Sequence, residues 1–286
     1  MKIINLIENT EGHPSCTAAH GLSFYIEAGT HRLLLDLGPS EETLSNAKNR
    51  GIDLTRVDTV ILSHGHYDHS GGILPFAELN KTAVIYMQKS AAGAFYSSRL
   101  NEAGAVEYRY IGIDEKLPSL AQVRLVEGDL VIDETLRLFT LRDRPFPLPF
   151  TNRRLWIKTG DTYVPDDFRH EQFLVVTEGG KSVLLSGCAH NGILNILSAY
   201  RQRFGTDPDL CISGFHLQKK SAYTAEEAEE IRDTAKRLTG FSTQIYTCHC
   251  TGVAAFDMMK EILGDQLSYV HSGEEIACFS KEITRS

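Results

Sequence analysis

The chain has 286 residues and a formal net charge of −8, because 37 aspartates and glutamates outnumber 29 lysines and arginines. This charge disfavours a broad basic face for nucleic acid, and no apolar run reaches the roughly 18 residues that span a membrane. The start, MKIINLIENTEG, also lacks the apolar stretch and cleavage site of a secretory signal. We therefore predict a cytoplasmic protein that keeps its six cysteines reduced.

The first ninety residues are typical of an α/β protein, in which short apolar strands alternate with helices. In chain order we expect strands over 21–29 and 31–38, a helix over 42–51, a strand over 57–63, a helix over 71–79 and a strand over 82–88. This order places the helices outside a sheet.

The remaining chain continues the alternation after a less regular middle. Residues 122–141 predict antiparallel strands around a turn at 127–129, and the prolines of 142–154 predict an irregular segment. The clearest hairpin is 173–186, with its Gly-Gly turn. Beyond it we expect helices over 191–205, 224–240 and 252–265, strands over 209–214 and 243–247, and a final strand pair. We find no linker, and predict one domain over 1–286 with an irregular or inserted region at about 95–160.

Three histidines and an aspartate follow the predicted strand at 57–63, namely His64, His66, Asp68 and His69. Residues two apart in an extended chain point to the same side, so His64 and His66 can bind one ion together. Asp68 and His69 can bind a second ion if the chain turns, which the glycines after them permit. Imidazole and carboxylate ligands favour zinc, with iron or manganese as alternatives, over calcium. The alternative interpretation is a set of hydrogen-bonded loop histidines without metal.

Two ligands per ion are too few, and two later strand ends repeat the pattern. SGCAHNG places His190 after an apolar strand, and TCHCTG does the same for His249. Ligands of α/β sheets bind beyond the carboxyl ends of strands, so we expect these loops to converge. Cys188 shares the face of His190 in an extended chain, whereas Cys250 should point away from His249. Buried core thiols are the alternative to thiolate ligands.

The string SHGHYDHSGG matches the His-x-His-x-Asp-His signature, and through it the chain resembles the metallo-β-lactamase superfamily. The resemblance implies an α/β fold, a four-layer αβ/βα sandwich, with two divalent metal ions. It implies the ligands His64, His66 and His190 for the first ion and Asp68, His69 and His249 for the second, with Asp68 also catalytic. Asp36, in LLLDLG, would orient a ligand. The alternative interpretation of Asp36 is an aspartate that only stabilises a turn.

The phrases AAHGLSFYIE, DDFRHEQFLVV, SGCAHNGILNIL, SGFHL and CHCTG narrow the resemblance. They are similar to the branch named 7,8-dihydropterin-6-yl-methyl-4-(β-D-ribofuranosyl)aminobenzene 5′-phosphate synthase. This branch implies that a dihydropterin is joined to a ribofuranosyl-aminobenzene phosphate. The same resemblance would bring His170 and Glu171 to the pocket, where the residues alone indicate a surface pair.

The chain departs from the family pattern where a bridging aspartate is expected, because Ser213 and Gly214 occupy that strand end and His216 follows. We therefore expect a weaker second metal site and a strongly cationic pocket, since Asp68 is the one carboxylate assigned to two divalent ions. Such a pocket favours an anionic substrate. His216 could accept a proton, donate one to a leaving group or replace the missing ligand; its alternative is a capping or core histidine.

These expectations favour a metal-dependent hydrolase or transferase that acts on a small anionic molecule, a phosphate or diphosphate of pterin-like type. Neither nucleic acid nor a membrane is expected as a partner, and the oligomeric state stays open. The alternatives are a metal-binding sensor or degenerate paralogue with little catalysis, and a phosphodiesterase or nuclease.

Overall fold

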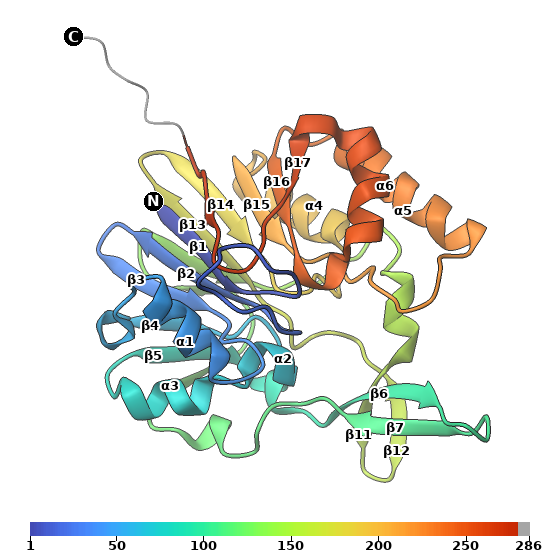
Figure 1. Cartoon of the computed structure of the whole chain (residues 1–286), viewed down its shortest axis with the longest axis horizontal. Helices are drawn as coiled ribbons and strands as arrows, with labels where there is room; N and C mark the ends of the chain where they lie inside the picture. The colour runs from blue at the N-terminus through green and yellow to red at the C-terminus, as the bar shows by residue number, and fades with distance from the viewer. Residues whose placement is uncertain (280–286) are drawn as a thin grey trace.

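A computed structural model describes residues 1–279, in which two seven-stranded sheets pack face to face and a third, four-stranded sheet stands apart (Figure 1). The first sheet has the strand order β18-β1-β2-β3-β4-β5-β8. Its strands are β1 (Lys2–Ile7), β2 (Ser23–Ala28), β3 (His31–Leu35), β4 (Thr59–Ile61), β5 (Val84–Gln88), β8 (Val123–Val126) and β18 (Glu275–Ile276). Strands β3, β4, β5 and β8 are parallel, so their carboxyl ends share one edge.

The second sheet has the order β17-β16-β15-β14-β13-β10-β9. Its strands are β9 (Leu130–Val131), β10 (Leu136–Phe139), β13 (Phe173–Glu178), β14 (Lys181–Leu185), β15 (Leu210–Ser213), β16 (Gln244–Thr247) and β17 (Leu267–Tyr269). Strands β14 to β17 are parallel, and β13 and β14 form the predicted hairpin. Each sheet thus presents a row of parallel strand ends from which loops can converge.

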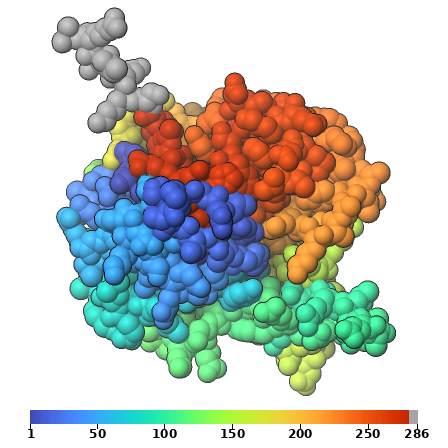
Figure 2. All heavy atoms as spheres, viewed as in Figure 1, coloured from blue at the N-terminus to red at the C-terminus, as the bar shows by residue number. Residues whose placement is uncertain are grey.

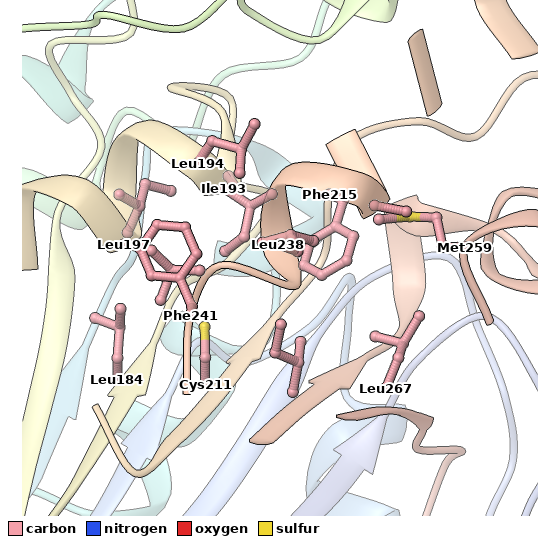
Figure 3. Packing of buried hydrophobic residues seen from close by; sticks show 14 of the residues in the cluster. Leu184, Ile193, Leu194, Leu197, Cys211, Phe215, Leu238, Phe241, Met259 and Leu267 are labelled. Atoms are coloured by element: carbon pink, nitrogen blue, oxygen red, sulfur yellow. The ribbon is translucent and has the colours of Figure 1, made fainter. Parts of the chain in front are cut away.

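Helices cover the outer faces of both sheets, which confirms the αβ/βα layering. The α-helices are α1 (Glu42–Asn49), α2 (Tyr67–Ser70), α3 (Ile73–Leu79), α4 (Ile193–Phe204), α5 (Ala225–Leu238) and α6 (Val253–Leu263). On the second sheet, Leu197 of α4 and Leu238 of α5 pack over Leu184 and Cys211 (Figure 3). Among residues 1–279, no helix is long and apolar enough to cross a membrane.

The core between the sheets is made of alternate residues of facing strands. Leu35 and Ile61 of the first sheet belong to the same buried cluster as Leu174 and Ile212 of the second. Burial of such apolar side chains is the main stabilising contribution to the sandwich. Short 3₁₀ helices connect the elements: η1 (Leu54–Arg56), η2 (Lys89–Ala92), η3 (Leu117–Ser119), η4 (Phe150–Arg154), η5 (His249–Thr251) and η6 (Gly264–Gln266).

The third sheet lies where the sequence predicts an irregular region. Its order is β12-β11-β6-β7, made of β6 (Phe95–Leu100), β7 (Val106–Tyr110), β11 (Leu155–Thr159) and β12 (Thr162–Pro165). Figure 2 shows this sheet protruding from the body. Stacked rings of Tyr108 and Tyr163, with centroids 3.9 Å apart, join its two outer strands. Cross-strand aromatic packing replaces the apolar alternation on which strand prediction depends.

Two predicted strand pairings are wrong because the true partners lie far away in sequence, and one strand of the first sheet is missing from the prediction. No antiparallel pair surrounds the turn at 127–129, because β8 runs parallel to β5 and the chain then crosses to the second sheet. The final strands do not pair with each other, since β17 joins β16 and β18 joins β1. Strand β1 is missing from the prediction because Asn5 interrupts its apolar run; Asn5 is buried and donates to the Val270 carbonyl.

A substitution at Gly71 can test how tightly the segment after β4 is packed. It has ordinary helical torsions, but a Cβ there would overlap the carbonyl oxygen of Pro39. We expect Gly71→Ala to lower the free energy of unfolding by about 3 kcal/mol, the upper range for overpacking, measured by urea denaturation. Gly240→Ala is the control, because its Cβ would meet nothing nearer than 3.3 Å. Equal stability of the two variants would contradict this packing.

Candidate metal centre

The loop after β4 turns in the way that the sequence pattern requires. His66 has extended torsions (φ −108°, ψ 149°), and α2 begins at the next residue. Asp68 and His69 therefore lie on a helical turn, which directs them away from the extended part of the loop. All four side chains of the motif are buried, with His64 and His69 fully inaccessible.

The later histidines meet this loop from the second sheet. His190 follows β14 and His249 begins η5, which follows β16. The His190 ring lies 4.9 Å from the rings of both His64 and His66, and the His249 ring lies 5.1 Å from that of His69. The strand ends of the two sheets therefore bring together six side chains from three distant parts of the chain.

The six side chains form two groups with the spacing of metal ligands. The donor atoms within each group lie within 4.8 Å of one another, and the groups are His64, His66 and His190, and Asp68, His69 and His249. In the described part of the chain, the Nε2 atoms of four of these histidines lack a hydrogen-bond partner: His64, His66, His190 and His249. A buried polar atom without a partner costs about 1–3 kcal/mol. The donor set and the unpaired nitrogens fit two divalent ions.

Asp36 connects the two groups. Its carboxylate accepts hydrogen bonds from His69 Nδ1 (2.6 Å) and from the Ser63 hydroxyl (2.7 Å). The Ser63 oxygen in turn accepts from His64 Nδ1 at 2.8 Å. Both imidazoles are thereby held with Nδ1 protonated, which leaves Nε2 as the nitrogen that can bind an ion, the arrangement typical of metal-binding histidines. Asp36 thus lies where the family resemblance places an orienting residue.

The two histidine rings from the second sheet, His190 and His249, are oriented by amide side chains. His190 Nδ1 contacts Asn152 Oδ1 at 3.2 Å, and His249 Nδ1 contacts Asn9 Oδ1 at 2.8 Å. An amide oxygen accepts only, so Nδ1 carries the proton in both rings. Nothing in the sequence pattern pointed to these two asparagines, because each lies far along the chain from its histidine.

Two buried glutamates hold the backbone of the histidine loops. Glu171 accepts from the backbone N–H groups of His190 (2.8 Å) and Asn191 (2.9 Å). Glu8 accepts from the backbone N–H of His249 at 2.9 Å and from the Tyr269 hydroxyl at 3.1 Å. Burial raises the pKa of Glu171 despite these hydrogen bonds. The family resemblance places Glu171 at the pocket with His170 but does not give it this role, and nothing in the sequence pattern pointed to Glu8.

The other predicted site residues, His170, His216 and Ser213, lie in different surroundings. His170 is buried, not on the surface; its Nδ1 accepts from Gly65 N–H, and its ring lies 5.4 Å from that of His66. The His216 ring lies 4.2 Å from that of His190. Ser213 is buried, and its hydroxyl donates to the neighbouring Gly214 carbonyl at 2.6 Å, so it is held by backbone.

The two groups of ligands differ in protonation. Burial lowers the pKa of His66 to about 3 and that of His64 and His190 well below the ordinary value. Burial also disfavours a charged His69, but the charges of Asp36 and Asp68 outweigh it and raise its pKa to about 9. The first group is therefore neutral at physiological pH, whereas His69 holds a proton that an ion must displace.

Two cysteines lie against the second group. Cys188 Sγ is 3.2 Å from His69 Nε2, and the donor atoms of Cys188, His249 and Cys250 lie within 4.8 Å of one another. The expectation that Cys250 points away from His249 is wrong. His249 has a φ of +50° and begins a 3₁₀ turn, so the alternation of an extended chain does not apply.

The sandwich and its histidine cluster define a class, the αβ/βα proteins that carry candidate metal ligands at the joined edges of two sheets. The model of the metallo-beta-lactamase superfamily matches residues 16–213, and the chain belongs to this superfamily. The fold and family inferred from the sequence are confirmed.

Three relatives cover nearly the whole chain. A 7,8-dihydropterin-6-methyl-4-(beta-D-ribofuranosyl)-aminobenzene-5′-phosphate synthase of Methanocaldococcus jannaschii is 29% identical, over 96% of each chain. An uncharacterized protein of the same organism is 27% identical, over 95% of this chain and 98% of its own. The crystal structure of Tm1679, a metal-dependent hydrolase of the beta-lactamase superfamily, has a TM-score of 0.79 and 27% identity, over 96% of this chain and 98% of its own.

The protonation of His69 predicts that the two groups bind ions with different pH dependence. Below its pKa of about 9, an ion must displace the proton from His69, so affinity for the second ion should rise at least about tenfold per pH unit between about pH 6 and 8. Affinity for the first ion should change little, since its histidines are already neutral. Titration calorimetry with zinc at several pH values measures both; parallel slopes for the two ions would contradict this assignment.

Proposed function

We propose that the chain is a metal-dependent enzyme that binds two divalent ions and acts on a small anionic substrate carrying phosphate or diphosphate. The observation that carries this proposal is the set of four buried Nε2 atoms without partners at the meeting point of two ligand groups. Histidine nitrogens with one carboxylate favour zinc, with iron or manganese as alternatives. The ions would supply Lewis acidity and a nucleophile at neutral pH.

His216 is suited to accept a proton beside this centre. The Thr151 hydroxyl donates to the His216 carbonyl, so its oxygen accepts from His216 Nδ1 at 2.7 Å. Nε2 is then the unprotonated nitrogen. Burial and the nearby charge of Arg154 lower the pKa of His216, which keeps the ring neutral. We assign His216 as the general base or hydrogen-bond acceptor of the reaction.

Asp68 supplies the negative charge of the centre. Its Oδ2 lies 3.5 Å from His249 Nε2 and 3.4 Å from His20 Nε2, an exposed histidine that sequence reasoning missed. Burial disfavours its ionised form, but the nearby histidines, the charge of His69 foremost, together outweigh this and lower the pKa of Asp68. We therefore assign Asp68 as an ionised ligand that also orients the reacting group. Asp68 is the one carboxylate among the six candidate ligands, and two divalent ions held mainly by neutral imidazoles would favour an anionic substrate.

The synthase relative supports a pterin-like substrate, and the hydrolase relative supports hydrolysis. A reduced pterin diphosphate, supplied with and without an aromatic amine acceptor, distinguishes transfer from hydrolysis. Phosphomonoesters, phosphodiesters and RNA complete the panel. Metal retention without turnover on any member would indicate a sensor or degenerate paralogue, and turnover confined to RNA would indicate a nuclease. Absence of metal after purification without chelator would overturn the proposal.

The first ligand group provides a direct test. Replacing both His64 and His66 with alanine should lower turnover at least about 10³-fold, since the charge stabilisation at the reacting atoms is lost. Metal content, measured by mass spectrometry, should fall with it. His31→Ala is the control, because His31 begins β3 at the end away from the centre and pairs with Asp58. Activity retained in the double variant would rule out this chemistry.

Arg154 provides a test of the substrate charge. It ends η4, the turn whose Thr151 and Asn152 contact His216 and His190, and its side chain is exposed. We expect Arg154→Ala to raise KM for a phosphorylated substrate about tenfold with little change in kcat, because a charged contact contributes about 1.5–3 kcal/mol at most. Arg153→Ala is the matched control, since Arg153 lines a separate cavity beside α4 and α5. An unchanged KM would exclude Arg154 from substrate binding.

A further inference from the structure

The Cys188 thiol adjoins donors of both ligand groups. Cys188 follows β14 and is buried, and its sulfur lies 3.2 Å from His69 Nε2. Its sulfur and the donor atoms of His64 and His69 lie within 4.8 Å of one another. The same limit holds for its sulfur with the donor atoms of His249 and Cys250. The sulfur therefore adjoins His69 and His249 of the second group and lies near His64 of the first.

These distances fit a shared coordination sphere. Zinc–nitrogen bonds of about 2.0–2.1 Å and a zinc–sulfur bond of about 2.3 Å place tetrahedral ligands about 3.3–3.6 Å apart. The separation of Asp68 Oδ2 from His249 Nε2 is 3.5 Å, within this range, and that of Cys188 Sγ from His69 Nε2 is 3.2 Å, a hydrogen-bond contact slightly shorter than it. The fully buried His249 Nε2 has no hydrogen-bond partner among the described residues, so its lone pair is free for an ion.

No carboxylate from the neighbouring strand end can reach this place. A Cβ at Gly214 would lie 2.5 Å from Cys250 Sγ, so the cysteine excludes any side chain there. The Ser213 hydroxyl is held by a backbone carbonyl. The Cys250 sulfur is itself fixed, because it accepts from His216 N–H at 3.3 Å and donates to the Cys188 carbonyl at 3.6 Å. Cys250 thus occupies the space of a bridging side chain and supports the Cys188 loop.

We propose that Cys188 binds as a thiolate shared between the two ions and serves as the anionic ligand that the β15 strand end does not provide. This inference rests on the metal centre of the proposed function. When the second ion binds, the sulfur–hydrogen bond breaks, the proton goes to solvent, and the sulfur lone pairs bind the ions. Cys250 is a positioning residue. The expectation of a weak second site assumed that a shared anionic ligand was missing, and Cys188 supplies one.

A thiolate ligand changes which metals the centre prefers. Thiolate favours zinc, iron and cobalt over magnesium, calcium and manganese. Among the proposed ligands alone, one thiolate and one carboxylate oppose two divalent ions, so the ions and their ligands together keep a positive charge. The centre therefore keeps its suitability for an anionic substrate while it gains a soft ligand.

X-ray absorption of the full-length zinc protein tests the ligand without any substitution. We expect a sulfur scatterer at about 2.3 Å in addition to nitrogen and oxygen. Cobalt-loaded protein should show a sulfur-to-cobalt charge-transfer band in the near ultraviolet. Cys188→Ser should lose both signals and bind the second ion more than about 100-fold more weakly, because losses outside the coordination sphere already cost about 10–100-fold.

Cys250→Ser is the matched control and should keep the sulfur signal. Circular dichroism and urea denaturation of both variants establish that they fold. A wild-type centre with only nitrogen and oxygen scatterers, or a sulfur signal that survives in Cys188→Ser, would overturn the inference and leave the metal centre intact. Failure of the wild-type protein to bind zinc or cobalt at all would instead overturn the proposed function.

Discussion

The candidate metal centre depends on imidazole nitrogens that are buried and have no hydrogen-bond partner among the described residues. Each such atom destabilises the folded chain by about 1–3 kcal/mol until something binds it. His64, His66, His190 and His249 all carry this cost through Nε2. The packed sandwich must therefore hold four rings in positions that the isolated loops would not adopt, and a bound cation would convert the cost into binding free energy.

Buried carboxylates hold the histidine loops in place despite this cost. Each carboxylate accepts hydrogen bonds from a segment distant in sequence. Asp36, after β3, holds rings of both ligand groups through His69 and Ser63. Glu171, before β13, holds the His190 loop, and Glu8, after β1, holds His249. Because both sheets contribute, the centre forms only when the sandwich is assembled.

The segment that departs most from the two-sheet sandwich borders the same centre. Phe95, at the root of the third sheet, packs on His170 with ring centroids 4.1 Å apart, and on His66 at 5.8 Å. The turn η4, just before β11, contributes Thr151 and Asn152 to the histidine rings. The protruding sheet is thus joined to the ligand loop, so changes in this segment can alter substrate binding without disturbing the two-sheet core.

The sequence by itself determined the layered fold, many of the local elements of the two main sheets and the six grouped candidate ligands, because apolar periodicity and the histidine spacing are local properties of the chain. Only the tertiary structure decided the pairing of β8, β17 and β18 and the roles of Glu8 and Asn152, since their partners lie far away in sequence. It also turned Cys250 toward the centre, through a positive φ at His249 that no alternation pattern predicts. Local spacing fixes which side chains a loop carries, whereas packing between sheets fixes what those side chains meet.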